Sequence, residues 1–482
     1  MSEQTLKEKT AKGIFWGGVG SFLQQFVGMI FGIIIARILV PDDYGLVAML
    51  AIFSIIANTI MDSGFTTALI NRKNINHEDY NAVFWFSSLC GICMYVVLFV
   101  SANFIAYFYN QPILINLSRV LFLSFLFSSL GIAHNAFLFK NLMVKQRGII
   151  DIIAVSISGV VGIVLALNGF SYWGLAIQQV IQSFISTSLR WYVVNWKPSF
   201  RINFSPIKEM FNFSVKVFLN NILTQVSLNI FSVLLGKNYS PSETGYYSQG
   251  FKWTNLGNSV ISGMLHSVAQ PVFVEVDGEQ ERQKAVFRKM LRFAAFVSFP
   301  IMIGLAFVAK EFVLITVGEK WINSVFYLRV FGIMTSFSFL SLLYGNLLFS
   351  RGKSNLMLYG NVLIYSFYLL LALFLISYGI YPLVIGCAIY TIFFAYFSWH
   401  FVAAGLINIT FVELLKDISP YLFLSLLVFL LVYFITLGVN NVYCSFVLKI
   451  VLSGLIYLFI LWISKSIVFK DAVNYILKKG NC

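Results

Sequence analysis

Five cationic side chains lie inside long apolar stretches of this sequence. They are Arg119, Lys216, Lys252, Arg329 and Lys449. If those stretches cross a membrane, each charge costs about 2.5–3.5 kcal/mol on insertion scales, so each cation requires either access to the lipid headgroups or a function. Counting along the helices places Arg119 and Lys252 roughly 10 Å below a membrane edge that is otherwise poor in positive charge. The chemistry that these residues predict is the binding of an anionic group.

The residue types also indicate which anion this is. Arginine pairs with phosphate through two parallel hydrogen bonds, so a phosphate or diphosphate is the best match. Asp62 and Asp151 fall at helix ends, and we expect no Asp or Glu in the middle of a membrane span. An exporter of organic cations would be expected to carry a carboxylate there. The expected cargo is therefore anionic.

Polar side chains form lines along three apolar segments, because steps of three and four residues return to one face of a helix. Such lines either face a cavity or form hydrogen bonds between helices, and the sequence leaves both open. They are Lys252, Asn255, Ser259, Ser262 and His266; Asn221, Gln225 and Asn229; and Ser54, Asn58 and Asp62. The candidate substrate-binding residues are Arg119, Lys252, Arg329, Asn255, Gln225, Asn221 and Lys216. Asp62 is the candidate coupling residue, although a helix-end turn in "MDSGF" is the simpler explanation.

Two short motifs indicate helix packing rather than chemistry. Cys90 and Cys93 form a CxxC inside an apolar helix without a neighbouring histidine, which favours packing over metal binding. Gly28 and Gly32 form a GxxxG, which lets two helices approach closely. We predict no disulfide framework, no metal and no cofactor, apart from a coupling ion that is H+ or Na+.

The elements that must position these residues are membrane-spanning helices. The chain has 482 residues and is 59% hydrophobic and 11% charged, with a mean hydropathy of +0.84 that no soluble domain of this length approaches. Apolar stretches long enough to cross a membrane recur along the whole chain. The fourteen expected spans are 13–36, 44–62, 82–108, 113–138, 148–168, 171–194, 212–236, 245–270, 286–309, 324–349, 355–378, 381–404, 418–438 and 443–465.

The basic residues are unevenly distributed between the two sides of the membrane. If the N-terminus is inside, the outer segments hold only Arg37, Lys237, Lys310 and Lys320. By the positive-inside rule, both ends of the chain are then cytoplasmic. The net charge of +14 is an orientation signal, and nucleic-acid binding is not needed to explain it. The first apolar segment lacks a cleavage site, so we expect it to be a retained span.

The two halves of the chain resemble each other. "RILVPDDYG" from Arg37 matches "KNYSPSETG" from Lys237, and "LSRVLF" around Arg119 matches "YLRVFG" around Arg329. The repeat contains six helices. Because this number is even, both halves would have the same orientation in the membrane, as in the parallel repeats of secondary transporters. We predict an all-α polytopic membrane protein with six-helix bundles at 1–200 and 201–410, then two additional helices and a cytoplasmic tail at 411–482.

Several motifs resemble one branch of a transporter superfamily. "ARILVPDDYGLVAML" at 36–50 is typical of the polysaccharide-export branch of the multidrug/oligosaccharidyl-lipid/polysaccharide exporters. "DSGFTTALINRK" at 62–73, "YNQP" at 109–112 and "GEKW" at 318–321 are similar to Wzx-type flippases of the colanic-acid and teichuronic-acid exporter group. The resemblance implies a MATE-like fold. It also implies that cations in a central cavity attract the diphosphate of a lipid-linked oligosaccharide while the lipid tail stays in the bilayer.

The predicted function is that of a flippase and not of an enzyme. It would move undecaprenyl-diphosphate-linked repeat units across the bacterial inner membrane for O-antigen, capsule or exopolysaccharide synthesis, alongside a polymerase and glycosyltransferases of the same pathway. A MATE-type small-molecule exporter is one alternative, disfavoured by the lack of mid-span acids. A membrane glycan polymerase or ligase is another, but the longest expected outer loop, 310–323, holds only "KEFVLITVGEKWIN".

Overall fold

The computed structural model describes residues 3–72, 75–141, 143–201, 203–276, 278–464, 466 and 469–470, and over these residues the regular structure is helical. Eleven of the described helical segments are long and apolar enough to cross a membrane. This confirms the prediction of an all-α polytopic membrane protein, whereas the number of fourteen spans stays a prediction. The chain forms two compact units, Met1–Gly245 and Tyr246–Cys482. The predicted boundaries near 200 and 410 also stay predictions.

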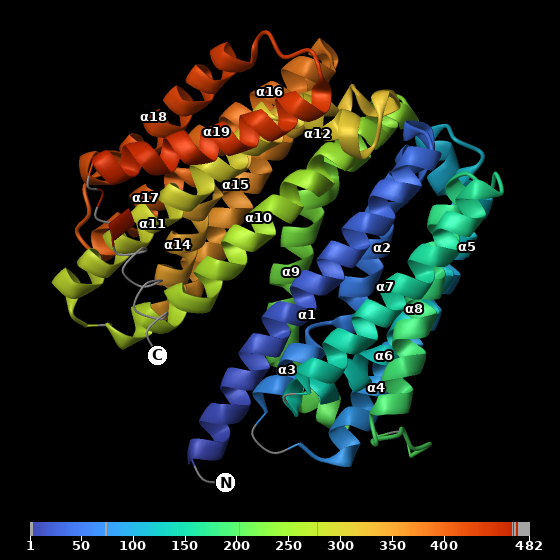
Figure 1. The fold of residues 1–482 in the computed structure, drawn as a ribbon. Coiled ribbons are helices and arrows are strands. Elements are labelled where there is room, and N and C mark those ends of the chain that lie inside the picture. Colours follow the sequence, from blue (N-terminus) through green and yellow to red (C-terminus); the bar gives the residue numbers. More distant parts are fainter. Residues whose placement is uncertain are drawn as a thin grey trace. The chain divides into compact units, whose positions relative to one another are not determined.

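The first unit contains α1 to α9 and the first turn of α10 (Figure 1). Helix α7 packs against both α1 and α8, and a buried core lies around Leu50, Phe122 and Phe125. The bounds are α1 (Glu3–Ile38), α2 (Pro41–Asp62), α3 (Phe65–Asn71), α4 (His77–Tyr109), α5 (Leu114–Leu121), α6 (Leu123–Lys140), α7 (Val144–Leu167), α8 (Tyr172–Val193) and α9 (Ser205–Asn238).

The second unit contains the rest of α10 and all later helices. Its core lies around Phe287, Phe299 and Tyr344. The bounds are α10 (Pro241–Glu275), α11 (Gln280–Phe307), α12 (Ala309–Thr316), α13 (Ser324–Thr335), α14 (Ser338–Ser350), α15 (Ser354–Leu375), α16 (Ile380–Tyr390), α17 (Ser398–Ala403), α18 (Phe411–Thr436) and α19 (Val442–Ile463). Short 3-10 turns lie at Glu319–Trp321, Ile376–Tyr378 and Ala404–Leu406, and a π-helical turn links α16 to α17 at Thr391–Tyr396.

Helices α2 and α10 begin with the same pattern, a proline followed four residues later by a glycine. Proline is favoured at a helix start, where its missing N–H is not needed. The two first turns touch through their backbones: a Cβ added to Gly245 would stand 2.8 Å from the carbonyl carbon of Pro41, and one added to Gly45 would stand 3.0 Å from the Cα of Pro241. The segments that the sequence aligns at an offset of 200 are therefore in direct contact within the first unit.

Helix α8 is long enough to span a membrane, with 22 residues, but is not among the eleven apolar segments. The reason lies in its composition, because Gln179, Gln182, Ser183, Ser186 and Arg190 lower its hydropathy. These five positions follow steps of three and four residues and so share one face of the helix. A spanning helix with one polar face needs polar partners or a cavity on that side.

Apolar spans are interrupted where α5 is followed by α6 and where α13 is followed by α14. At each break a serine hydroxyl donates a hydrogen bond to a backbone carbonyl. Ser124 Oγ donates to the Leu121 carbonyl at 2.7 Å, and Ser298 Oγ donates to the Ser336 carbonyl at 2.8 Å. Broken helices are tolerated in a membrane when nearby side chains satisfy the freed backbone groups, as they do here.

Helix α12 corrects one expectation about the charges. The sequence predicts an outer loop at 310–323, but residues Ala309–Thr316 form a helix that packs against α19. Its Glu311 is buried, and Glu311 Oε1 lies 2.6 Å from Lys449 Nζ, with both side chains only 12% exposed. Lys449 therefore forms an ion pair within the protein, and its partner lies in a segment that the sequence predicts to be a loop.

Candidate functional site

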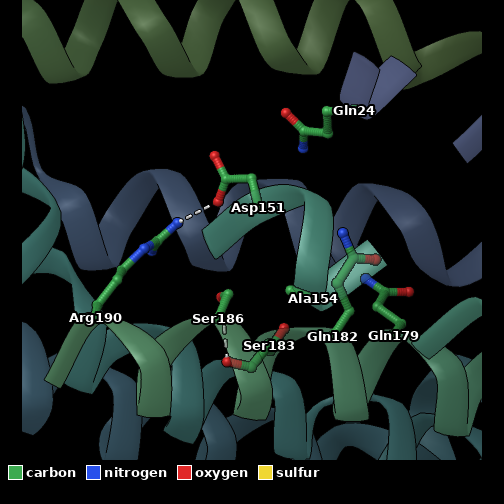
Figure 2. A pocket seen from close by; sticks show the side chains of 8 residues that line it. All are labelled: Gln24, Asp151, Ala154, Gln179, Gln182, Ser183, Ser186 and Arg190. Carbon is green, nitrogen blue, oxygen red and sulfur yellow. Dashed lines mark hydrogen bonds and ion pairs between the residues drawn. The ribbon is translucent and has the colours of Figure 1, made fainter. Parts of the chain in front are cut away.

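The polar face of α8 borders a cavity inside the first unit. The cavity has a volume of about 350 Å³ and lies among α1, α7 and α8. Figure 2 shows Gln179 and Gln182 extending side by side from α8, with Gln24 of α1 across from them. The residues that line it are Gln24, Asp151, Ala154, Gln179, Gln182, Ser183, Ser186 and Arg190.

Close packing of glycines holds α1 and α7 together beside this cavity. The Cα of Gly148 would lie 3.3 Å from a Cβ added to Gly20, and Gly28 is in ordinary contact with Val155 of α7. The predicted packing role of Gly28 agrees with this contact. Because Gly20 lies one turn before Gln24, the close approach of the two helices places the Gln24 amide opposite α7 and α8.

One ion pair closes part of the cavity wall. Arg190 donates from Nη2 to Asp151 Oδ1 at 3.2 Å, and both side chains are 18% exposed (Figure 2). Asp151 lies seven residues into α7, roughly 10 Å from its start, rather than at the helix end predicted from the sequence. The opposite charges compensate each other, so the pair adds polarity to the wall without adding net charge.

The amide groups of the cavity are available to a ligand. Over the described residues, the side chains of Gln24, Gln179 and Gln182 form no hydrogen bond with another protein group. Ser186 Oγ donates to the carbonyl of Ser183 at 3.3 Å and retains acceptor capacity. The cavity therefore offers several uncharged donors and acceptors. Sequence reasoning missed this site because the charges and polar lines it followed lie on other helices, although the spacing of polar residues on α8 was visible.

Three of the predicted cations have no acidic partner in the part of the chain that the structure describes. Arg119 on α5 is half-buried, and its guanidinium lies 4.5 Å from the ring centroid of Phe99. Lys252 on α10 is half-buried, and Arg329 on α13 is exposed. Among the residues that the structure describes, none of these three cations has an ion-pair partner. They remain available to an anionic ligand.

The predicted polar residues are divided between the two units. Asn221 on α9 is exposed. The backbone carbonyl of Gln225 accepts a hydrogen bond from Asn229 Nδ2 at 2.9 Å. Asn255 on α10 is exposed. The side chains of Lys216 and His266 lie outside the described part of the chain.

The candidate residues belong to two different units, so their meeting in one site stays a prediction. Arg119, Asn221, Gln225 and Asp62 belong to the first unit, and Lys252, Asn255 and Arg329 to the second. A shared chamber for Arg119 and Arg329 stays a prediction. Among the predicted substrate-binding residues whose side chains the structure describes, none lines the cavity of α1, α7 and α8.

Asp62 closes the C-terminal turn of α2. The hydroxyl of Thr66 donates to its carboxylate, and the two residues that directly follow the helix, Ser63 and Gly64, have φ angles of 44° and 73°. This agrees with a helix-end turn. Asp62 is also half-buried, so its carboxylate is not simply a solvated surface charge.

A family model described as "polysaccharide biosynthesis protein" matches residues 34–326. An uncharacterized membrane protein in the cps region of Klebsiella pneumoniae is 24% identical over 96% of each chain. The teichuronic acid biosynthesis protein TuaB of Bacillus subtilis is 27% identical over 64% of each chain. The lipopolysaccharide biosynthesis protein WzxC of Escherichia coli is 23% identical over 67% of this chain and 65% of its own length. The chain thus matches slightly less than two thirds of TuaB and WzxC.

Solved structures share the fold. The lipid II flippase MurJ in an inward closed conformation has a TM-score of 0.75 at 13% identity, covering 95% of this chain and 99% of its own. A multidrug resistance MATE transporter in an inward-facing conformation has a TM-score of 0.62 at 16% identity, covering 83% of this chain and 95% of its own. These likenesses confirm the expected MATE-like fold.

Proposed function

Because the chain belongs to the polysaccharide biosynthesis protein family, we propose that it is a flippase for lipid-linked oligosaccharides. Family membership is the observation that carries this proposal. The names of TuaB and WzxC link relatives to teichuronic acid and lipopolysaccharide synthesis, and a further relative is the succinoglycan biosynthesis transport protein ExoT of Rhizobium meliloti. The protein is a transporter and not an enzyme. Its substrate is an undecaprenyl-diphosphate-linked repeat unit, delivered by glycosyltransferases and passed to a polymerase.

The multi-pass chain would lie in the bacterial inner membrane with both termini cytoplasmic, as the distribution of Lys and Arg supports. An inward-open cavity accepts the head group, and the protein then opens outward while the lipid tail stays in the bilayer. Arg119, Lys252 and Arg329 contact the diphosphate in this proposal. Their lack of ion-pair partners among the described residues supports that role.

Replacing Arg119 or Arg329 with alanine is expected to lower surface polysaccharide about tenfold, because each charge-assisted hydrogen bond to the diphosphate contributes roughly 1.5–3 kcal/mol. Surface polymer is measured by immunoblot of intact cells, alongside the amount of protein in the membrane. Arg201→Ala is the matched control, because Arg201 is exposed outside the helices. Normal polymer in both variants, at normal protein levels, would refute the cationic site.

Asp62 is proposed as the coupling residue for H+ or Na+. Asp62→Asn is then expected to remove most of the pH or sodium dependence of flipping, because the amide can neither take up a proton nor carry a negative charge. The measurement is flipping in proteoliposomes across a pH gradient and across a sodium gradient. Thr66→Val serves as the control, since it removes the hydroxyl that donates to Asp62 but keeps the carboxylate. Unchanged ion dependence in Asp62→Asn would leave Asp62 with the role of a helix-end turn.

A further inference from the structure

The cavity among α1, α7 and α8 has no place in the anion-binding scheme. Its described lining contains none of the three cations that lack ion-pair partners, and the arginine in that lining, Arg190, is already paired with Asp151. We infer that this cavity binds the uncharged, hydroxyl-rich sugars of the lipid-linked substrate. This inference rests on the proposed function and deepens it, because it separates the site that recognises the saccharide from the residues that bind the diphosphate.

The chemistry of the wall matches hydroxyl groups. Each glutamine amide supplies two donors and an acceptor, and each serine hydroxyl both donates and accepts. A sugar hydroxyl has the same double capacity, so it can pair with either type of group. An anion, in contrast, needs donors with an excess of positive charge, and the paired Asp151 and Arg190 provide none. The wall therefore favours a neutral saccharide.

The geometry indicates a site for a ligand rather than bonding between helices. Polar side chains that join membrane helices are expected to hydrogen-bond to one another. Here, over the described residues, the amides of Gln24, Gln179 and Gln182 have no protein partner, and a space of about 350 Å³ separates the side chains. That volume lies within the range of about 300–1,000 Å³ that is typical of ligand sites. Unpaired amides around an open volume within a membrane protein are best explained by a polar ligand.

The position on α8 suits an extended ligand. From Gln179 to Arg190 the polar face runs over eleven residue steps, which corresponds to roughly 16 Å along the helix. Several hydroxyl groups of one oligosaccharide could be bound along this line. Recognition by many weak, uncharged hydrogen bonds also permits release, because no single contact is strong.

The test compares two substrates and two variants. Purified protein in lipid nanodiscs is titrated with undecaprenyl diphosphate that carries the complete repeat unit, prepared from the host strain, and with undecaprenyl diphosphate that carries only the first sugar. The double variant Gln179→Leu/Gln182→Leu removes two amides of the cavity and keeps side chains of similar size. Gln178→Leu is the matched control on the same helix, because Gln178 lies against Gly162 of α7 and not in the cavity lining.

For the double variant we expect about tenfold weaker binding of the complete repeat unit and unchanged binding of the single-sugar lipid. Gln178→Leu should bind both lipids like the wild type. If the double variant does not reach the membrane, Ser183→Ala/Ser186→Ala replaces it, with an expected loss of about threefold. Equal loss for both lipids, or no loss for either, would overturn the saccharide site. If the wild type binds neither lipid, the proposed function itself is wrong, and this outcome is distinct from the previous two.

Discussion

Gly245→Ala is expected to remove most of the protein from the membrane, whereas Gly263→Ala on the same helix should leave its amount unchanged. A methyl group added to Gly245 would overlap the carbonyl oxygen of Pro41 and stand 3.2 Å from the Pro41 Cα. These are backbone atoms, so no flexible side chain can move aside. A Cβ added to Gly263 meets nothing within 4 Å.

The expected loss of stability in Gly245→Ala is large because the contact is rigid. Overpacking against side chains typically costs about 1–3 kcal/mol, and a backbone-to-backbone contact lies at or beyond the upper end of that range. Gly45→Ala should have a similar effect, because an added methyl group would stand 2.5 Å from the carbonyl carbon of Pro241. The measurement is the thermal stability and yield of a fluorescent fusion in detergent. Equal yields for Gly245→Ala and Gly263→Ala would contradict the importance of this contact.

The sequence shows that the residues of this contact are equivalent in the two halves, but it does not predict that they touch. Pro41 and Pro241, and likewise Gly45 and Gly245, align at an offset of 200 because the two halves repeat. Aligning the two halves identifies equivalent positions in the sequence. Equivalent positions are in contact only if the helices that carry them pack against each other. That interface depends on how the helices pack, which the pattern of one helix does not contain.

The class of protein could be predicted because lipid imposes a simple rule. An apolar segment must form a helix across the membrane, since unpaired backbone groups are too costly there. Hydropathy alone therefore indicates an all-α membrane protein. The same rule placed a span at 171–194, where α8 lies, but it did not single out the polar face of this helix, which carries most of the cavity lining. Its glutamines are uncharged, so a search for intramembrane charges does not find them.

The ion pair of α12 and α19 shows a second limit of the sequence. Lys449 is recognisable as a charge within an apolar helix, but its partner lies 138 residues earlier in the chain. Glu311 follows directly after Lys310 in a short segment that hydropathy assigns to a loop. Only the packing of α12 against α19 reveals that the acid is buried beside the lysine. By contrast, Arg119 and Lys252 have no ion-pair partner among the described residues, which keeps their predicted anion-binding role open.

Glu311→Leu is expected to destabilise the second unit by about 3–5 kcal/mol, because removing one partner of a buried ion pair leaves the other charge uncompensated. Lys449 Nζ lies 2.6 Å from Glu311 Oε1, and Ser445 Oγ donates to the same oxygen at 3.3 Å. After the change, Lys449 would keep only weaker contacts, such as the Phe307 ring centroid 5.0 Å away. The result is measured as the thermal stability of the purified protein.

The double variant Glu311→Leu/Lys449→Leu distinguishes the loss of the whole ion pair from the loss of one of its two partners. Replacing both charges removes the buried lysine together with its need for a partner, so the double variant should be closer to the wild type than Glu311→Leu is. Lys449→Leu alone should be destabilised as well, since it leaves Glu311 buried at 12% exposure. If the two single losses simply add in the double variant, the charges do not interact. Lys449 would then have to be counted again among the cations available to an anionic substrate.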